Sequence, residues 1–310
     1  MSRRLSYNRS AFARRVQISQ DSLFVIVEGK DLDARFYDRV CDSSTSIETA
    51  GYQIWLAEQL KDDVTGAVAG GKKAVLAHYD YFKTAKKLSV TSSSGKHSIA
   101  FMIDRDNDDL SGGKKRSPHV IYTEMFDVEA EAFVRGNDEE ALAGILSLDS
   151  ASASQLAADL KGWVKDLADT WREWVTLCTV AKAVGAGCDV GFGRESWVNN
   201  PKYGSAESVK LAAAEAKISA STRRTSAEFN AISTRVRGRI NSCYSRGHSY
   251  RLLKGKWLAP YLVYRVKGHF GSAPVHYGGV EDSVARAYLA TCDFRENWVN
   301  YYRDRLEALI

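Results

Sequence analysis

Two apolar runs that each end in acidic residues constrain the fold of this 310-residue chain most strongly. The run "LFVIV" at 23–27 leads directly into Glu28, and "SIAFMI" at 98–103 leads into Asp104 and Asp106. Apolar runs of this length, bounded by glycine or polar residues, predict strands buried on both faces, as in a parallel sheet. Open α/β sheets bind ligands at the carboxyl ends of their strands, so the acids stand where a site is expected.

The segments between and after these runs predict a βαβ series. We expect helices within 31–42 and 66–85, a strand within 51–57, and a strand followed by an acidic helix start within 119–133. Strands that alternate with helices predict a parallel sheet flanked by helices. We therefore assign residues 1–136 to an α/β domain.

The pattern changes after this domain to long helical stretches. They fall at 138–147, 152–184, 204–244 and 281–309. Trp163, Trp171 and Trp174 lie in the second stretch, and core packing or a partner interface is their ordinary explanation. We expect residues 137–310 to form a mainly helical domain.

Composition narrows the class of protein. The formal net charge of +5 and the pI of about 8.8 suggest an acidic partner such as nucleic acid. The five cysteines are scattered without a Cys-x-x-Cys pair, so no zinc site is expected. No signal peptide follows the basic start, and nowhere do roughly 18 apolar residues run together to span a membrane. We expect a cytoplasmic protein with reduced thiols and no membrane association.

Carboxylates follow three of the predicted strands. They are Glu28, the pair Asp104 and Asp106, and the pair Asp127 and Glu129. An Asp-x-Asp motif alone is common at helix N-caps and turns. Its combination with an upstream Glu-Gly strand end is more restrictive. If the strands are neighbours, the acids converge at one edge, which is what binding of Mg²⁺ requires.

A resemblance to a known family rests on these motifs. "VIVEGKDLDARFY" together with "AFMIDRDND" resembles the TOPRIM domain, the metal-binding α/β module of topoisomerases, bacterial primases and OLD-family nucleases. Within that superfamily the chain is most similar to the stand-alone, AriB-like TOPRIM nucleases of the PARIS anti-phage defence system. "TEMFDVEAEAF" and "RGHSYRLLKGKWL" resemble that group's acidic strand–helix element and its late Gly-Lys element. The resemblance covers the first 135 residues and then only 246–258.

The resemblance implies roles for individual acids. Glu28 corresponds to the family's first-strand glutamate, a metal ligand or general base. Asp104 and Asp106 correspond to its Asp-x-Asp ligands of Mg²⁺ or Mn²⁺, and Glu129 to an additional acid. Lys30 could contact a phosphate.

The family's usual pattern has consecutive acids after Gly-Lys, whereas Leu32 interrupts them here. Whether Asp31 or Asp33 is a ligand stays open, and Asp33 could instead cap the following helix.

A basic stretch in the second half suggests a nucleic-acid contact. Between Lys217 and Lys267 there are twelve Lys or Arg residues and one acid, Glu228. Such a bias neutralises phosphates, and interleaved aromatic residues could stack on bases. A solvated helix face is the plain alternative, and some of the cations could face an acidic protein partner. Our candidates for substrate binding in this stretch are Arg246, His248, Lys254 and Lys256.

The function that the resemblance implies is a metal-dependent toxin effector that cleaves RNA, with tRNA the expected substrate. An ABC-type, AriA-like ATPase is expected to hold it inactive and to release it on infection, after which it forms a homodimer. Nothing in the residue spacing separates RNA from DNA.

Two other functions compete with this hypothesis. "FMIDRDND" also resembles the Asp-x-Asp strand of haloacid-dehalogenase-like phosphatases. That family usually has Thr or Val where this chain has Asp108, and it needs no upstream Glu-Gly. The other alternative is a non-catalytic regulatory subunit of an ATPase complex, whose acids would bind metal only for structure.

Overall fold

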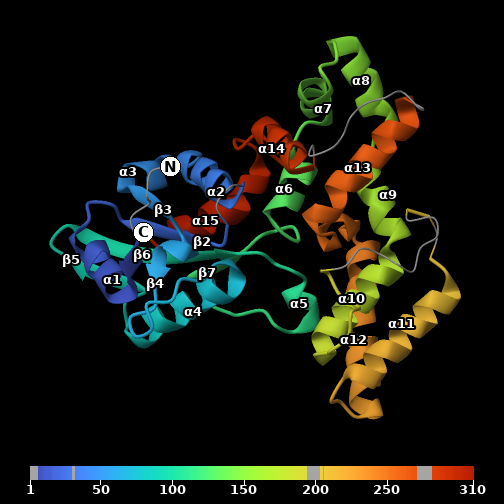
Figure 1. Cartoon of the computed structure of the whole chain (residues 1–310). Helices are drawn as coiled ribbons and strands as arrows, with labels where there is room; N and C mark the ends of the chain where they lie inside the picture. The colour runs from blue at the N-terminus through green and yellow to red at the C-terminus, as the bar shows by residue number, and fades with distance from the viewer. Residues whose placement is uncertain (1–5, 30–31, 194–202, 205, 271–280) are drawn as a thin grey trace. The chain divides into compact units, whose positions relative to one another are not determined.

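The computed structural model describes residues 6–29, 32–193, 203–204, 206–270 and 281–310. The chain forms two compact units that each draw on separate segments (Figure 1). Unit 1 comprises Met1–Asp104, Lys115–Glu124 and Asp293–Ile310, and unit 2 comprises Arg105–Lys114 and Met125–Cys292. These bounds differ from the predicted domains 1–136 and 137–310, because the chain passes between the units several times.

Unit 1 contains a five-stranded sheet. Its strands are β2 (Leu23–Val27), β3 (Tyr52–Leu56), β5 (Ser89–Ser92), β6 (Gly95–Ile103) and β7 (Val120–Tyr122). The parallel pairs are β2 with β3, β2 with β6 and β6 with β7. A separate two-stranded parallel sheet joins β1 (Tyr7–Asn8) to β4 (Leu60–Lys61).

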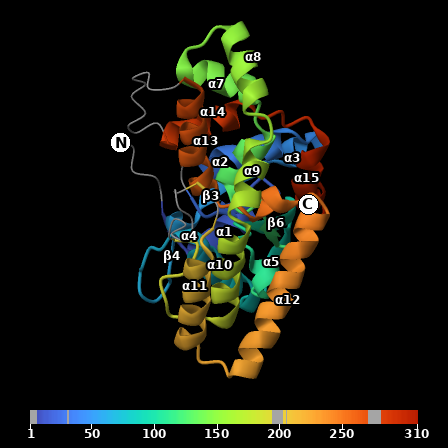
Figure 2. The same ribbon diagram turned by 90° about the vertical axis from the view of Figure 1, so that its right-hand side faces the viewer.

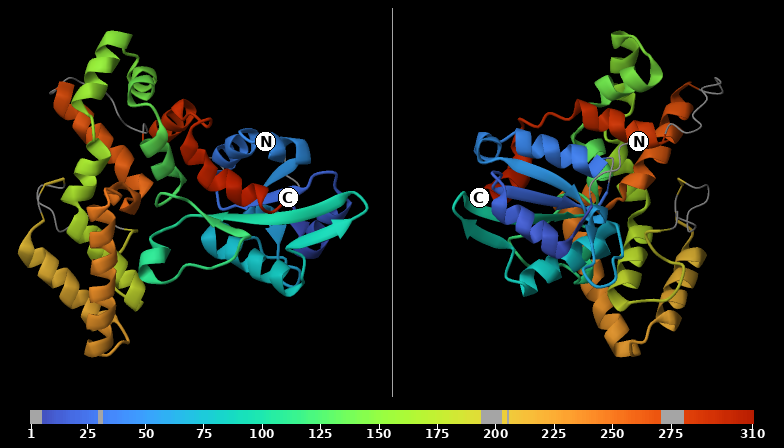
Figure 3. Two further views of the ribbon diagram at one scale, coloured as in Figure 1. Left: turned by 180° about the vertical axis from the view of Figure 1, so that it is seen from behind. Right: turned by 60° about the vertical axis from the view of Figure 1, so that its left-hand side comes forward.

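The sheet is mixed rather than wholly parallel, which corrects the prediction. β5 pairs antiparallel with the first half of β6, and the two form the long hairpin drawn in teal in Figure 3. Only Ser93 and Ser94 connect these strands. Two residues can close a hairpin, whereas a parallel crossover needs a dozen or more, so the antiparallel pairing follows from the loop length.

Helices cover both faces of this sheet. They are α1 (Arg9–Ile18), α2 (Leu32–Asp42), α3 (Thr45–Ala50), α4 (Gly71–Thr84) and α15 (Asn300–Glu307), with single turns η1 (Ala57–Gln59) and η3 (Asn297–Val299). α1 and α4 lie on one face, and α2, α3 and α15 on the other (Figure 1). All five residues of β2 are buried, as expected for a strand covered on both sides.

The end of the chain belongs to unit 1, where it packs on α2. The ring of Phe36 contacts the rings of Phe294, Trp298 and Tyr302. The single helical stretch predicted for 281–309 is therefore wrong in its extent: α14 (Glu281–Thr291) ends before this segment, and α15 begins after η3.

Unit 2 is helical in its described residues, as predicted for most of this region. Its helices are α5 (Asp108–Ser111), α6 (Val128–Arg135), α7 (Asp138–Leu146), α8 (Ser150–Asp159), α9 (Trp163–Thr170), α10 (Arg172–Val184), α11 (Ser208–Ser221), α12 (Ser226–Ser245), α13 (Gly255–Phe270) and α14, with the turn η2 (Ser249–Leu252). Figure 2 shows α11 and α12 as an antiparallel pair beside α10.

Two of the predicted long helices are broken. The stretch 152–184 contains α8, α9 and α10, and Gly162 just before α9 has a φ of 81°, which an α-helix cannot contain. A new helix begins at Thr225, because its hydroxyl oxygen accepts from the Glu228 N–H while the Glu228 carboxylate accepts from the Thr225 N–H.

Tryptophans fill the centre of unit 2. Trp163, Trp171 and Trp174 are all fully buried, which confirms core packing as their explanation. α10, on which Trp174 lies, packs against α11, α12 and α5. Among the helices that the structure describes, none combines the length and the apolar character needed to cross a membrane.

Candidate functional site

The sheet of unit 1 brings together two of the predicted acids. β2 and β6 are neighbouring parallel strands, with Ile26 opposite Phe101, so both strands end at the same edge. At that edge the Glu28 carboxylate accepts a hydrogen bond from the backbone N–H of Asp104 at 2.9 Å. Both acids are half-buried. The register of a parallel pair thus places the two predicted ligands beside each other.

A lysine that the sequence interpretation missed lies next to this pair. Lys72, in the first turn of α4, donates from Nζ to the backbone carbonyl of Asp104. Its Nζ also lies 5.6 Å from the centre of the Tyr122 ring. The signal in the sequence was the Gly70-Gly71-Lys72 start of a predicted helix, because the N-terminus of a helix is a place where anionic ligands bind.

The residues after Glu28 are only partly described. Lys30, the predicted phosphate contact, and Asp31 lie outside the described residues. The Asp33 carboxylate accepts from the Gly29 N–H at 2.8 Å. A Cβ on residue 29 would lie 3.2 Å from Asp33 Oδ2, so the close approach favours glycine. Asp33 therefore fixes the strand-to-helix turn, which is a structural role.

Asp106 lies in unit 2, in an unusual turn. Asp106 and Asn107 have φ angles of 48° and 58°, in the left-handed region that residues other than glycine rarely adopt. Each such residue costs on the order of 1–3 kcal/mol, so surrounding contacts must maintain the turn. One of these contacts is the Asp106 N–H, which donates to the carbonyl of Phe126 at 2.9 Å.

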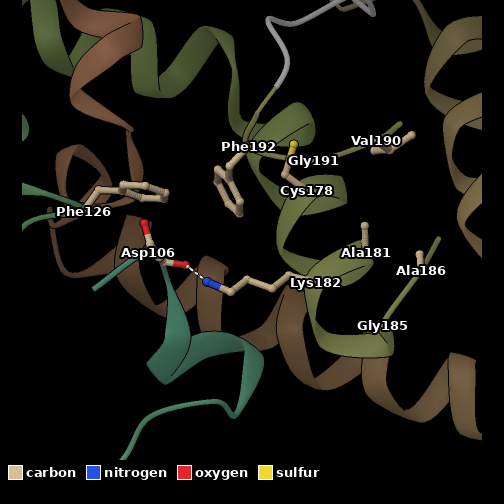
Figure 4. A pocket seen from close by; sticks show the side chains of 10 residues that line it. All are labelled: Asp106, Phe126, Cys178, Ala181, Lys182, Gly185, Ala186, Val190, Gly191 and Phe192. Atoms are coloured by element: carbon tan, nitrogen blue, oxygen red, sulfur yellow. Dashed lines mark hydrogen bonds between the residues drawn. The ribbon is translucent and has the colours of Figure 1, made fainter. Parts of the chain in front are cut away.

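Two cations from distant helices hold this turn. Lys182 Nζ lies 2.7 Å from the Asp106 carbonyl oxygen (Figure 4). The same Nζ lies 2.7 Å from Asp108 Oδ1. The Arg239 guanidinium donates to the carbonyls of Asp109 and Leu110 at 3.1 and 2.9 Å. Arg239 belongs to the basic stretch predicted to grip nucleic acid, so at least this cation has a structural role.

Asp127 caps α6 and is buried. Its carboxylate accepts from the N–H groups of Ala130, at 2.8 Å, and Gly255, at 3.0 and 3.1 Å. Burial raises the pKa of Asp127 well above its usual range, and the nearby charges of Glu129 and Asp106 raise it further, against the two backbone hydrogen bonds. Glu129 and Asp106 are therefore both close enough to Asp127 to disfavour its charged form.

The late Gly-Lys element lies against this cap. A Cβ on Gly255 would lie 2.3 Å from Glu129 Cβ and 2.6 Å from the Ala130 nitrogen, so the site admits only glycine. Residues 125–133 of the segment "TEMFDVEAEAF" thus form one contact region within unit 2 with the segment "LLKGKWL", which the sequence predicted as a separate motif.

The four predicted substrate-binding residues of the basic stretch are all in unit 2. Arg246 and Lys256 are exposed. His248 is half-buried, with its ring 6.3 Å from that of Tyr250. Lys254 Nζ donates to the Phe192 carbonyl at 3.2 Å.

Several other cations of the stretch form ion pairs within unit 2. Arg237 contacts Glu173 and Glu215, at 3.3 and 2.9 Å, and Arg265 contacts Asp166 at 2.8 Å. Because these cations are paired with carboxylates, fewer cations of the stretch are available to bind the phosphates of a nucleic acid.

The predicted ligands are all carboxylates, and Mg²⁺ prefers carboxylate oxygens, so their chemistry suits a hard cation. The predicted ligands are divided, with Glu28 and Asp104 in unit 1 and Asp106 and Glu129 in unit 2. Within the described residues, no group of three or more His, Cys, Asp or Glu side chains has the arrangement of a metal site.

No known protein-family model matches this chain, and no curated protein shows significant similarity to it. The functional interpretation therefore depends on the residues themselves.

Proposed function

We propose that this protein is a Mg²⁺- or Mn²⁺-dependent nuclease of the TOPRIM type. Glu28, Asp104 and Asp106 would hold the metal, with Glu129 as an additional acid. The observation that carries the proposal is the contact between Glu28 and the Asp104 N–H at the ends of two adjacent parallel strands. Asp106 follows Asp104 by two residues, so its Cα lies within about 7 Å of that of Asp104 in any conformation.

The chemistry assigns a separate task to each group. A divalent cation held by these acids would withdraw charge from the scissile phosphate. The Asp104 N–H fixes one oxygen of the Glu28 carboxylate, which orients this group as a ligand or general base. Lys72 adds a positive charge beside the acids, where a phosphate would be attracted.

The substrate and the partners follow from the resemblance to the defence nucleases. We propose RNA, and tRNA in particular, as the substrate, an ABC-type ATPase as the inhibitory partner and a homodimer as the active form. The exposed cations Arg246 and Lys256 support a polyanionic substrate.

The test is cleavage of total RNA and of plasmid DNA by the purified protein, with Mg²⁺, with Mn²⁺ and with a chelator. We expect cleavage with either metal and none with the chelator. Absence of metal-dependent cleavage of both substrates, also after co-expression with and release from a partner ATPase, contradicts the proposal. Hydrolysis of p-nitrophenyl phosphate without nucleic-acid cleavage would favour the phosphatase alternative.

Matched variants separate catalysis from structure. Glu28→Gln keeps an oxygen that can accept from the Asp104 N–H but removes the charge, so it should fold and lose cleavage by about 100-fold or more. Glu48→Ala, an exposed glutamate of unit 1, is the control and should retain cleavage. Full activity of Glu28→Gln would show that Glu28 has only a structural role.

A further inference from the structure

Unit 2 contains a pocket of about 360 Å³ that includes one of the proposed metal ligands. Asp106 forms part of its wall, together with Lys182 of α10 and the aromatic residues Phe126 and Phe192 (Figure 4). Cys178 and the small residues around it complete the lining. The pocket thus combines aromatic surface with one carboxylate and one ammonium group.

The aromatic part of the wall is held in place. The ring centres of Phe126 and Phe192 lie 4.9 Å apart at an angle of 50°, and Phe192 stacks on Trp257 with centres 5.7 Å apart. Trp257 is buried, and Phe126 precedes the α6 cap residue Asp127. Lys254, which donates to the Phe192 carbonyl, fixes the backbone there. Phe192 is itself half-buried and lines the pocket.

The volume and the lining residues of the pocket favour a flat aromatic ligand with polar groups at its edge. The volume falls within the range of roughly 300–1,000 Å³ typical of small-molecule sites. Every nucleobase has a π-face that stacks on aromatic side chains, and its edge carries hydrogen-bond donors and acceptors. The Asp106 carboxylate can accept from such an edge and the Lys182 ammonium can donate to it.

We propose that this pocket binds one unstacked nucleobase of a single-stranded nucleic-acid substrate. The inference rests on the proposed function, because Asp106 belongs both to the pocket and to the acids assigned to the metal. A base in the pocket would bring its own phosphodiester toward Asp106. A base inside a duplex cannot reach such a pocket without being extruded, so the pocket selects single strands, loops or ends.

The experiment measures binding without cleavage. Fluorescein-labelled 12-nucleotide strands of RNA and of DNA are titrated with the protein in chelator at constant salt, and fluorescence anisotropy is recorded. Phe192→Ala should weaken binding by roughly 5- to 150-fold, the range that loss of one stacked base corresponds to. Phe192→Tyr should bind like the wild type. Phe192→Leu, which keeps the apolar volume but has no ring, should bind more weakly than the wild type. Phe270→Ala, a substitution of a 38% exposed phenylalanine outside the pocket, is the control and should leave affinity unchanged.

An abasic scan links the pocket to a base. Removing the base at one position of the strand should weaken binding to the wild type but not to Phe192→Ala. Equal affinity of all abasic strands, equal binding of duplex and single strand, or no binding of either strand overturns the inference. The two proposals fail separately: metal-dependent cleavage that is indifferent to Phe192 refutes the pocket alone, and Phe192-dependent binding without cleavage in metal refutes the nuclease alone.

Discussion

The two units position their acids by different physical means. In unit 1, Glu28 and Asp104 meet because two parallel strands pair in register and end together. In unit 2, Asp106 lies in a left-handed turn, and Asp127 lies at a helix cap. These positions depend on groups that are distant in the sequence.

The difference shows where each arrangement is vulnerable. The contact between Glu28 and Asp104 in unit 1 follows from the backbone pairing of β2 with β6. Many buried side chains stabilise that pairing. The turn in unit 2 depends on a few groups from distant helices, the side chains of Lys182 and Arg239, and the cap depends on the N–H groups of Ala130 and Gly255. Single substitutions should therefore disturb the acids of unit 2 more than those of unit 1.

The largest effect is expected for Gly255→Ala. The added Cβ would collide with Glu129 and the Ala130 nitrogen, and the Asp127 carboxylate would lose the Gly255 N–H. Overpacking and the loss of a buried hydrogen bond together should lower the free energy of unfolding by about 4 kcal/mol. Urea unfolding followed by tryptophan fluorescence measures the change.

Gly144→Ala, at a helical glycine with open space around its Cα, should be neutral or slightly stabilising. Equal midpoints for the two variants would contradict the proposed dependence on Gly255.

A second prediction concerns unit 1 and its pH dependence. The pKa of His78 is lowered from 6.5 to about 4, mainly by burial and also by the Arg9 charge, against the opposing effects of the hydrogen bond to the Ala57 carbonyl and the Asp62 charge. The Arg9 guanidinium donates to His78 Nδ1 at 2.9 Å, so the ring is neutral with its proton on Nε2.

Because the pKa in the folded state is lowered, the stability from His78 is complete above pH 6.5 and is lost as the pH falls to about 4. The loss should reach about 3 kcal/mol. Urea midpoints across this range should fall less steeply for His78→Gln than for the wild type. His269→Gln, at an exposed histidine of unit 2, is the control and should follow the wild type. Parallel curves for all three proteins would show that the His78 ring is not held neutral.

The smallest effect is expected for Lys182→Met. The Lys182 and Asp108 side chains are 33% and 9% exposed, between a surface pair and a buried one, so the loss should be about 2 kcal/mol. A double-mutant cycle with Asp108→Asn measures the coupling, and nuclease activity should fall in parallel because the turn that carries Asp106 is released.

Lys165→Met is the matched control, since the exposed pair of Lys165 with Asp169 is screened by water and should contribute almost nothing to stability. Equal losses of unfolding free energy for Lys182→Met and Lys165→Met would show that Lys182 is an ordinary surface cation. The turn of unit 2 would then not depend on it.

Local patterns were sufficient to predict much of unit 1. The apolar run before Glu28 predicted a buried strand, and the structure has β2 at 23–27 with every residue buried. The uninterrupted apolar run and its short length gave this result, because a strand covered on both faces carries apolar residues at every position. The β5 strand, with its sequence Ser-Val-Thr-Ser, carries no such apolar signal, so the antiparallel edge of the sheet was missed.

The boundaries in the helical region were harder to predict. The break at Thr225 had a readable signal in its capping box, whereas the break around Trp171 has none among the local residues. Helix interiors are set by periodicity, but helix ends depend on tertiary contacts wherever no cap is present.

The sequence by itself determined the acids and the strands that carry them, because hydrophobic period and strand-end chemistry are local properties. Only the tertiary structure decided that Lys72 and Lys182 touch the carbonyls of Asp104 and Asp106, and that Gly255 caps Asp127 together with Ala130. It also decided that Arg237, Arg239 and Arg265 of the basic stretch contact groups within unit 2. Contacts between residues more than 30 positions apart depend on how the elements pack, and no local pattern encodes that packing.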